Sequence, residues 1–182
     1  LAELPGGGWG SFAFSSDDAW IAAQQYRTPN DSDVFLIHAK TGERQQILPA
    51  PGGPAAGYAG FAWSPDNQRL YLTTNQGGEF SELAVWERKT GKLTVLSHHI
   101  PWDIENFQLS PDGQRILAVA NANGRDEMHL FDATSGKELP QPAIGSGSLG
   151  GGHWHETLAG QVAYSLNSPQ SPGDVYTLDV AT

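Results

Sequence analysis

The feature that most constrains the fold of this chain is a repeat of roughly 45 to 49 residues, marked by two short turn motifs. The first motif is a Ser-Pro-Asp turn at Ser64, placed between two stretches of branched and aromatic residues, Phe61–Trp63 and Arg69–Leu72. A near copy surrounds Ser110 and a weaker copy surrounds Ser15, so that the three serines lie 49 and 46 residues apart. Proline and small polar residues favour a tight turn. Each copy therefore predicts a strand, a turn and a second strand.

The second marker is a glycine that follows an apolar run and a Lys-Thr or Thr-Ser pair. It recurs at Gly42, Gly91 and Gly136, with spacings of 49 and 45 residues. Glycine supplies the positive φ that a short hairpin loop needs. Two markers that share one period indicate a repeat architecture, and a period in the forties with strand patterning is typical of propeller blades.

We therefore predict an all-β fold: one β-propeller segment over residues 1–182, with about four blades of four antiparallel strands. The predicted blades cover residues 9–48, 58–96, 104–140 and 153–182, and residues 141–152 are predicted to be a flexible connector. The last blade stops where the others continue into their glycine, so we expect it to lack its outer strand and to be incomplete. An open strand edge and exposed blade faces tend to pair with something. We expect that the chain either associates with a copy of itself or is a piece of a larger molecule. A compact four-bladed ring is a further alternative.

Composition excludes several classes of function. The formal net charge is -10, which disfavours nucleic-acid binding because a phosphate backbone needs a basic surface. No apolar run reaches the length of a membrane span, and no phosphate loop or dinucleotide fingerprint predicts a cofactor. The chain has no cysteine, which leaves the compartment open between cytoplasm and periplasm. It starts at Leu1, which favours a mature or excised product.

The long, varied loops are predicted to lie at one end of the strands, opposite the Ser-Pro-Asp turns. A rigid scaffold with variable loops on one rim commonly carries its binding residues there. The linker after the second blade holds four candidates for contact with a substrate or partner, His98, His99, Trp102 and Asp103. A plain connecting loop is the alternative interpretation.

Two further candidates are His153 and His155, whose spacing places both imidazoles on one side of a strand. An aromatic first strand packed between blades explains them better than a metal site, and we predict no metal. Residues 146–150 resemble the nucleophile elbow G-x-S-x-G but have serine in the first position, within a Gly/Ser connector. We predict no catalytic residue in this chain.

The turns at Ser64 and Ser110 resemble those of the propeller repeats in TolB-like proteins and in the prolyl oligopeptidase family of serine peptidases. The stretch 162–179 is similar to the last blade before the hydrolase domain in acylaminoacyl-peptidase and dipeptidyl-peptidase relatives, where a Pro-x-Asp-(Ile/Val)-Tyr-x-Leu-Asp pattern often precedes the catalytic half. The resemblance covers essentially the whole chain. It implies the second half of a seven- or eight-bladed propeller.

In that family the propeller is noncatalytic, and it restricts access to an α/β-hydrolase domain that carries the serine, aspartate and histidine. The resemblance thus implies a gate and scaffold whose partners are a peptide substrate and the hydrolase domain of the parent protein. It implies no peptidase activity for this chain alone. Two copies could also form a homodimer that closes a larger ring. The alternative function is a TolB-like module that binds another protein, with no peptidase domain in its parent.

Overall fold

The computed structural model describes residues 3–158 and 160–180, and within them every named element is a β-strand. The first eight strands are β1 (Trp9–Phe14), β2 (Trp20–Thr28), β3 (Asp31–His38), β4 (Arg44–Leu48), β5 (Tyr58–Trp63), β6 (Arg69–Thr74), β7 (Glu82–Glu87) and β8 (Leu93–Val95). The others are β9 (Ile104–Leu109), β10 (Arg115–Ala122), β11 (Arg125–Asp132), β12 (Ser148–Trp154), β13 (Gln161–Ser168) and β14 (Ser171–Asp179). No helix in the described part of the chain could cross a membrane.

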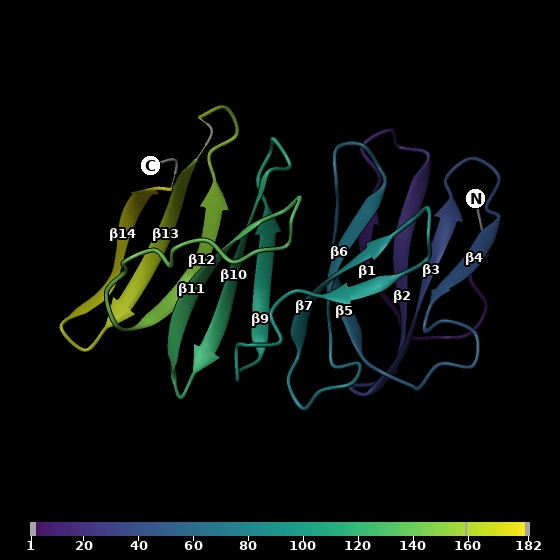
Figure 1. Ribbon diagram of the computed structural model, residues 1–182, viewed down its shortest axis with the longest axis horizontal. Coiled ribbons are helices and arrows are strands. Elements are labelled where there is room, and N and C mark those ends of the chain that lie inside the picture. Colours follow the sequence, from purple (N-terminus) through teal and green to yellow (C-terminus); the bar gives the residue numbers. More distant parts are fainter. Residues whose placement is uncertain (1–2, 159, 181–182) are drawn as a thin grey trace. The chain divides into compact units, whose positions relative to one another are not determined.

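The strands form four sheets in which consecutive strands pair antiparallel (Figure 1). Two sheets have four strands, β1 to β4 and β5 to β8, and two have three, β9 to β11 and β12 to β14. The predicted all-β class is confirmed, with sheets of the meander type that propeller blades have. Among the described residues the last sheet lacks an outer strand, as the sequence predicted.

Two predicted boundaries are wrong. The third blade, predicted over residues 104–140, has three strands instead of four. In place of the fourth strand there is only an isolated bridge between Glu138 and Phe131, extended by one hydrogen bond from the Leu139 N–H to the Leu130 carbonyl. Pro140 follows directly, and proline cannot donate a ladder hydrogen bond. The predicted connector 141–152 is also partly wrong, because β12 begins at Ser148 rather than at His153.

The chain divides into two compact units, residues 1–99 and residues 100–182. Each unit contains two sheets and has its own core. In unit 1 the core joins β1 to β4 with β5 to β8 through the buried side chains Ala22, Val34, Leu36, Ile47, Leu48, Ala56, Tyr58, Trp63, Leu70, Leu72 and Trp86. In unit 2 the core joins β9 to β11 with β12 to β14 through Leu117, Met128, Leu130, Val162, Tyr164 and Leu166.

A tryptophan at the end of the first strand of the second sheet anchors each pair. The Trp63 indole N–H donates to the Ala13 carbonyl at 3.2 Å, and the Trp154 indole N–H donates to the Gln108 carbonyl at 3.2 Å. Trp63 pairs with Leu70 and Trp154 pairs with Val162, so the two rings hold equivalent positions in their sheets. A buried indole that satisfies its N–H fixes one sheet on its neighbour.

The turns at Ser15, Ser64 and Ser110 share one pattern of hydrogen bonds, although the first has Ser16 in place of the proline. The Ser64 hydroxyl donates to Asp66 at 2.5 Å and accepts the Arg69 N–H at 2.9 Å. The turns at Ser15 and Ser110 repeat both bonds. The hydroxyl bond is the main cause that lowers the pKa of Asp66 below 3.8, and it lowers the pKa values of Asp17 and Asp112 in the same way.

The glycine turns are equally regular. Gly42, Gly91 and Gly136 have φ values of 71°, 69° and 70°. Each donates its N–H to the carbonyl four residues earlier at 2.8 Å. Both sequence markers therefore identify repeated hairpin turns, as predicted.

Candidate functional site

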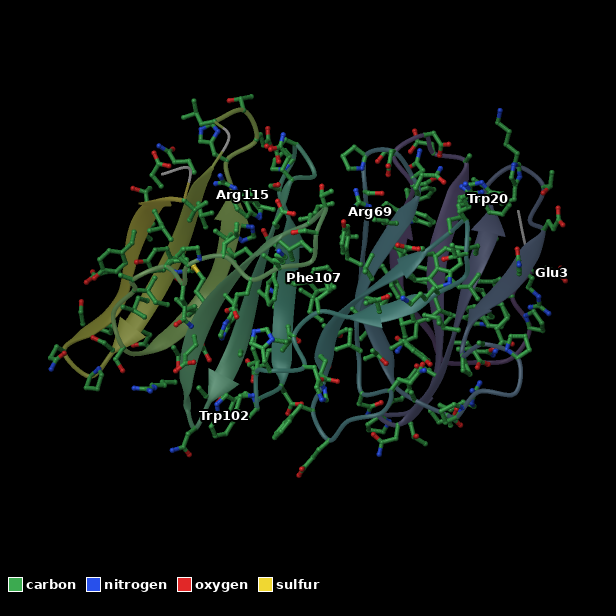
Figure 2. All side chains as sticks on the ribbon, viewed as in Figure 1. Glu3, Trp20, Arg69, Trp102, Phe107 and Arg115 are labelled. Atoms are coloured by element: carbon green, nitrogen blue, oxygen red, sulfur yellow. The ribbon has the colours of Figure 1, made fainter. Side chains whose placement is uncertain are left out.

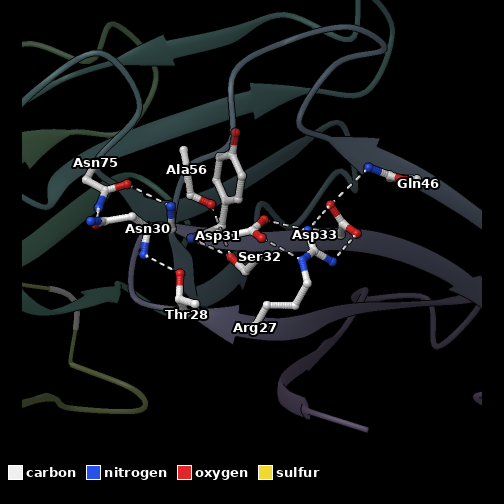
Figure 3. Close-up of polar contacts among 11 residues, drawn as sticks. Arg27, Thr28, Asn30, Asp31, Ser32, Asp33, Gln46, Ala56 and Asn75 are labelled. Carbon is white, nitrogen blue, oxygen red and sulfur yellow. Dashed lines mark hydrogen bonds and ion pairs between the residues drawn. The ribbon is translucent and has the colours of Figure 1, made fainter. Parts of the chain in front are cut away.

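The β2–β3 end of unit 1 carries an ion network centred on Arg27 (Figure 3). Its guanidinium binds Asp31 at 2.6 and 2.9 Å and Asp33 at 2.7 and 3.0 Å. The Gln46 amide adds a bond to Asp33 at 3.2 Å. Asp31 first and Asp33 second raise the pKa of Arg27, and Arg27 lowers the pKa of Asp31. The network lies on the predicted rim, and its charged side chains pair with one another.

A second network ties the linker before β5 to the neighbouring hairpins (Figure 3). The Asn75 side chain accepts the Gly57 N–H at 2.7 Å and donates to Asn30 at 2.6 Å. Ser32 donates its N–H to the Ala56 carbonyl at 3.0 Å. A rim held in this way keeps its shape, because each loop is bonded to the next one.

Tyr58 reaches the same rim from the core. Its hydroxyl donates to the Gln76 side chain at 2.6 Å, and its carbonyl accepts the Gln24 amide at 2.5 Å. Burial, with a smaller contribution from the charge of Asp33, raises the pKa of Tyr58 to about 12. The phenol therefore stays protonated and acts as a donor.

His98 lies in unit 1 and is held by Glu82, the first residue of β7. The imidazole Nδ1 is 2.7 Å from Glu82 Oε1, and the Glu82 carboxylate is buried while the His98 ring is exposed. The neighbouring His99 is exposed. The sequence prediction missed Glu82, since nothing in the pattern Phe80-Ser81-Glu82 separates a buried acid from an ordinary turn residue.

Trp102 and Asp103 lie in unit 2, directly before β9; Figure 2 labels Trp102. Trp102 is half-buried and Asp103 is exposed. The Asp103 carbonyl accepts the Asn121 N–H at 3.3 Å, near the end of β10. This arrangement places both candidates at the β10–β11 end of the unit.

The two other candidates lie elsewhere in unit 2. His155 borders a cavity of about 270 Å³ together with Ser110, Pro111 and Asp112, just before β10 begins. This is the end of β10 opposite to Asp103, so His155 and Asp103 do not share a site. His153, on β12, is exposed and has its Nδ1 3.5 Å from the Gln108 amide.

His155 has an evident structural role. The ring Nδ1 of His155 accepts hydrogen bonds from the backbone N–H groups of Thr157 and Leu158 at 3.1 and 3.0 Å. The backbone N–H of His155 donates to the Gln161 carbonyl at 2.8 Å. Ser64 makes the corresponding backbone bond to Arg69 at 2.9 Å. His155 thus stands where the other sheets have the turn serine. Over residues 3–158 and 160–180, no group of three or more histidines and acids could hold a metal ion.

Comparison with known proteins places this geometry among propellers. No family profile matches the sequence. A stretch of 97 residues is 28% identical to eukaryotic translation initiation factor 3 subunit I of Scheffersomyces stipitis, covering 53% of this chain and 25% of that protein. Among solved structures, a prolyl endopeptidase matches 94% of this chain with a TM-score of 0.75 and 16% identity.

Two more structures agree with it. Prolyl oligopeptidase B of Galerina marginata, bound to a 35mer substrate, matches 96% of the chain with a TM-score of 0.75 and 13% identity. TolB of Acinetobacter baumannii matches 96% with a TM-score of 0.68 and 19% identity. The chain has a β-propeller fold. It spans 24% and 25% of the two peptidase chains and 41% of TolB, and the resemblance that the sequence predicted is confirmed at the level of the fold.

Proposed function

We propose that residues 1–182 are a noncatalytic propeller segment of a serine peptidase of the prolyl oligopeptidase type. The segment limits substrate access to a hydrolase domain and serves as its scaffold. The observation that carries this proposal is the match to a prolyl endopeptidase over 94% of the chain at a TM-score of 0.75. The last-blade pattern of the sequence adds support, since its run over residues 174–179 lies within β14.

The rim of unit 1 suits such a role. A gate that sorts substrates by size must keep its shape. Arg27 binds Asp33 within the β2–β3 hairpin, and Asn75 bonds its own loop to Gly57 and Asn30 of the neighbouring loops. Contact with a substrate or partner through His98, His99, Trp102 and Asp103 is part of the proposal. Contact of His153 and His155 with a substrate or partner also stays a prediction. His155 would make that contact in addition to its hydrogen bonds within the turn.

The parent gene provides the decisive test. We expect a coding sequence for an α/β-hydrolase domain with a true G-x-S-x-G motif beside this segment. In the parent protein, deletion of the segment should increase cleavage of a folded protein substrate relative to a chromogenic dipeptide. A parent without a hydrolase domain, or an unchanged ratio of the two rates, would contradict the proposal.

A TolB-like protein-binding module is the second candidate. TolB is more similar in sequence, at 19% identity, than the prolyl endopeptidase at 16%. This alternative expects a parent without a peptidase domain, so the same gene distinguishes the two functions.

We also propose that the chain associates with itself through the exposed face of the β1 sheet. Phe12 and Phe14 are 58% and 60% exposed, whereas their counterparts Phe61 and Trp63 pack in the core of unit 1. Large exposed aromatic side chains at a blade face favour association. Sedimentation velocity should show a dimer that the double change Phe12→Ser and Phe14→Ser dissociates, and a monomer at all concentrations would refute it.

A further inference from the structure

The edge of β11 that faces away from β10 contains a gap in its hydrogen bonds. At this edge the Asp132 N–H donates to the Lys137 carbonyl at 2.9 Å. Every second residue of a strand faces the same edge, and the pairing of β10 with β11 has no bulge, so the backbone groups of Met128 face this edge as well. Among the described residues no hydrogen bond joins the outward N–H or carbonyl of Met128 to another part of the chain. One backbone donor and one backbone acceptor are therefore open at a single position.

The equivalent residues of the first two sheets have no such gap. Leu83 of β7 and Val34 of β3 are equivalent to Met128, because all three lie four residues before the end of their strand. The Leu83 carbonyl accepts the Leu96 N–H at 2.7 Å, and the Leu83 N–H donates to the Ser97 hydroxyl at 2.8 Å. Val34 is paired with β4. The chain thus satisfies this position in both sheets of unit 1 and leaves it open in β11.

The chain also closes both ends of the gap. On one side the Leu139 N–H donates to the Leu130 carbonyl at 2.7 Å, and Pro140 then ends the ladder because it has no N–H. On the other side the Asp126 N–H donates to the Gly147 carbonyl at 2.9 Å. The gap is therefore one residue long, and a further strand could not run through it without meeting the chain at each end.

A cavity of about 240 Å³ lies between β11 and the segment 141–146, beside the gap. Its lining includes Met128, Arg125, Gln141, Pro142, Ile144 and Ser146. Ile144 packs against the core of unit 2, which holds this wall in place. Drug-sized ligands need about 300–1,000 Å³, so a cavity of this size suits a smaller group such as one residue. We call the gap and this cavity the slot.

The lining of the slot carries a positive charge that is only weakly paired. The Arg125 side chain is 61% exposed, and its ion pair with Glu127 has a long N–O distance of 3.4 Å. The other acid of the lining, Asp126, is engaged, because its carboxylate accepts the Leu149 N–H at 2.6 Å. A guanidinium has five N–H donors. Arg125 can therefore bind a further carboxylate at the end of the slot.

We propose that the slot binds the carboxyl-terminal residue of a peptide. The N–H of that residue donates to the Met128 carbonyl, one carboxylate oxygen accepts the Met128 N–H, and the carboxylate pairs with Arg125. A guest that runs antiparallel to β11, as residues 137–139 do, has its carboxyl end toward Arg125. Capture of a terminal carboxylate by backbone N–H groups is a recurring mode of peptide recognition, and an arginine strengthens it. The inference does not depend on the proposed peptidase function.

The test uses the 182-residue protein and the dipeptide N-acetyl-Ala-Ala with a free carboxylate. Titration followed by amide NMR should give saturable binding at millimolar peptide, with the largest shifts at residues 126–130 and 144–147. The same dipeptide with a methyl group on its last amide nitrogen should bind about tenfold more weakly, because it has no N–H for the Met128 carbonyl. The dipeptide with a terminal carboxamide should bind about two- to fivefold more weakly, because it has no charge to pair with Arg125.

Two protein variants locate the contact. Arg125→Gln should weaken the free-acid dipeptide about two- to fivefold and leave the carboxamide unchanged. Ala143→Trp places a large side chain at an exposed position of the lining and should abolish saturable binding, whereas the matched change Ala55→Trp, in an exposed loop of unit 1, should not.

Several results would overturn the proposal. No saturable binding to the unchanged protein, shifts centred elsewhere, or full binding to the Ala143→Trp variant would exclude the slot as the site. Equal affinity for the N-methylated dipeptide would exclude the backbone contact with Met128. Equal affinity for the free acid and the carboxamide would exclude recognition of a carboxyl terminus.

Discussion

Unit 1 and unit 2 each pack one sheet on the next through an equivalent tryptophan, yet they close that pair differently. In unit 1 the turns at Ser15 and Ser64 are joined, since the Ser16 N–H donates to the Asn67 side chain at 2.6 Å. In unit 2 the corresponding residues are Pro111, which has no N–H, and Leu158, whose side chain has no acceptor. A cavity of about 270 Å³ lies beside Pro111. The outer strand differs in the same sense, because β8 covers β7 and no described strand covers β14. The repeat thus determines that the sheets form, while single residues determine whether the turns of two packed sheets are joined by a hydrogen bond.

The strongest test of this comparison removes the tryptophans. Trp63 is 6% exposed, so Trp63→Ala should lower the free energy of unfolding by about 3–5 kcal/mol. Trp154→Ala should cost less, because that ring is half-buried beside a less complete sheet. Urea unfolding followed by circular dichroism measures both, and Trp63→Phe separates loss of the ring from loss of the indole bond. Equal losses at the two sites would contradict the difference between the units.

The shared turn network should give the next largest effect. Ser64→Ala removes the donor to Asp66 and the acceptor of the Arg69 N–H, at a cost of about 1–2 kcal/mol at neutral pH. The matched control is the exposed Ser135→Ala, which should cost less.

Acid should reduce that difference. The native pKa of Asp66 is depressed below the ordinary 3.8, so its stabilising contribution is present well above pH 3.8 and is lost as the pH falls through the native pKa. We therefore expect the loss caused by Ser64→Ala to shrink between pH 5 and the acid side of pH 3.8. A loss that stays constant with pH would show that the carboxylate plays no part in the turn.

Exchanging the residues at positions 16 and 111 tests the contact between the turns of two packed sheets. Ser16→Pro copies Pro111 into unit 1 and removes the N–H that binds Asn67, so it should cost about 1 kcal/mol. The reverse change, Pro111→Ser, supplies an N–H without an acceptor on Leu158 and should leave the thermal midpoint nearly unchanged. Stabilisation by Pro111→Ser would mean that the turns of unit 2 are already as close as those of unit 1.

The smallest expected effect concerns His155. Because this residue caps the turn before β13 as the serines do in the other sheets, His155→Ser should change the free energy of unfolding by less than about 0.5 kcal/mol. His155→Ala should cost more, about 1 kcal/mol, since it leaves the N–H groups of Thr157 and Leu158 unpaired. Equal results for serine and alanine would remove the capping role.

The sequence predicted the fold where turn chemistry is local. Ser64, Pro65 and Asp66 place the strands on both sides of them, and the glycines at 42, 91 and 136 place the next hairpins. The start of β12 was missed because its glycines read as a flexible connector. A side chain on Gly150 would lie 2.0 Å from the Ser165 hydroxyl, and one on Gly152 would lie 2.7 Å from Leu117. Those glycines allow close packing against neighbouring strands, which can be recognised only when the positions of those strands are known.

The candidate site was less predictable for a related reason. Sequence spacing placed His153 and His155 on one strand, but it could not show that His155 caps a turn or that Asp103 lies at the other end of β10. Glu82 is recognised as the partner of His98 only when β7 and the linker after β8 are brought together. Long-range contacts of this kind leave no signal in one sequence.

The turn networks have a consequence for synthesis of the protein. Each Ser-Pro-Asp network joins groups no more than five residues apart, so it can form as soon as those residues have left the ribosome. A blade that carries such a turn can then emerge with its first two strands already in register, before the side chains of the next blade exist. The hairpins of such a chain can therefore form one after another during synthesis. Because the contacts of each turn are local, a blade can be gained or lost during evolution while the turns of the remaining blades stay the same.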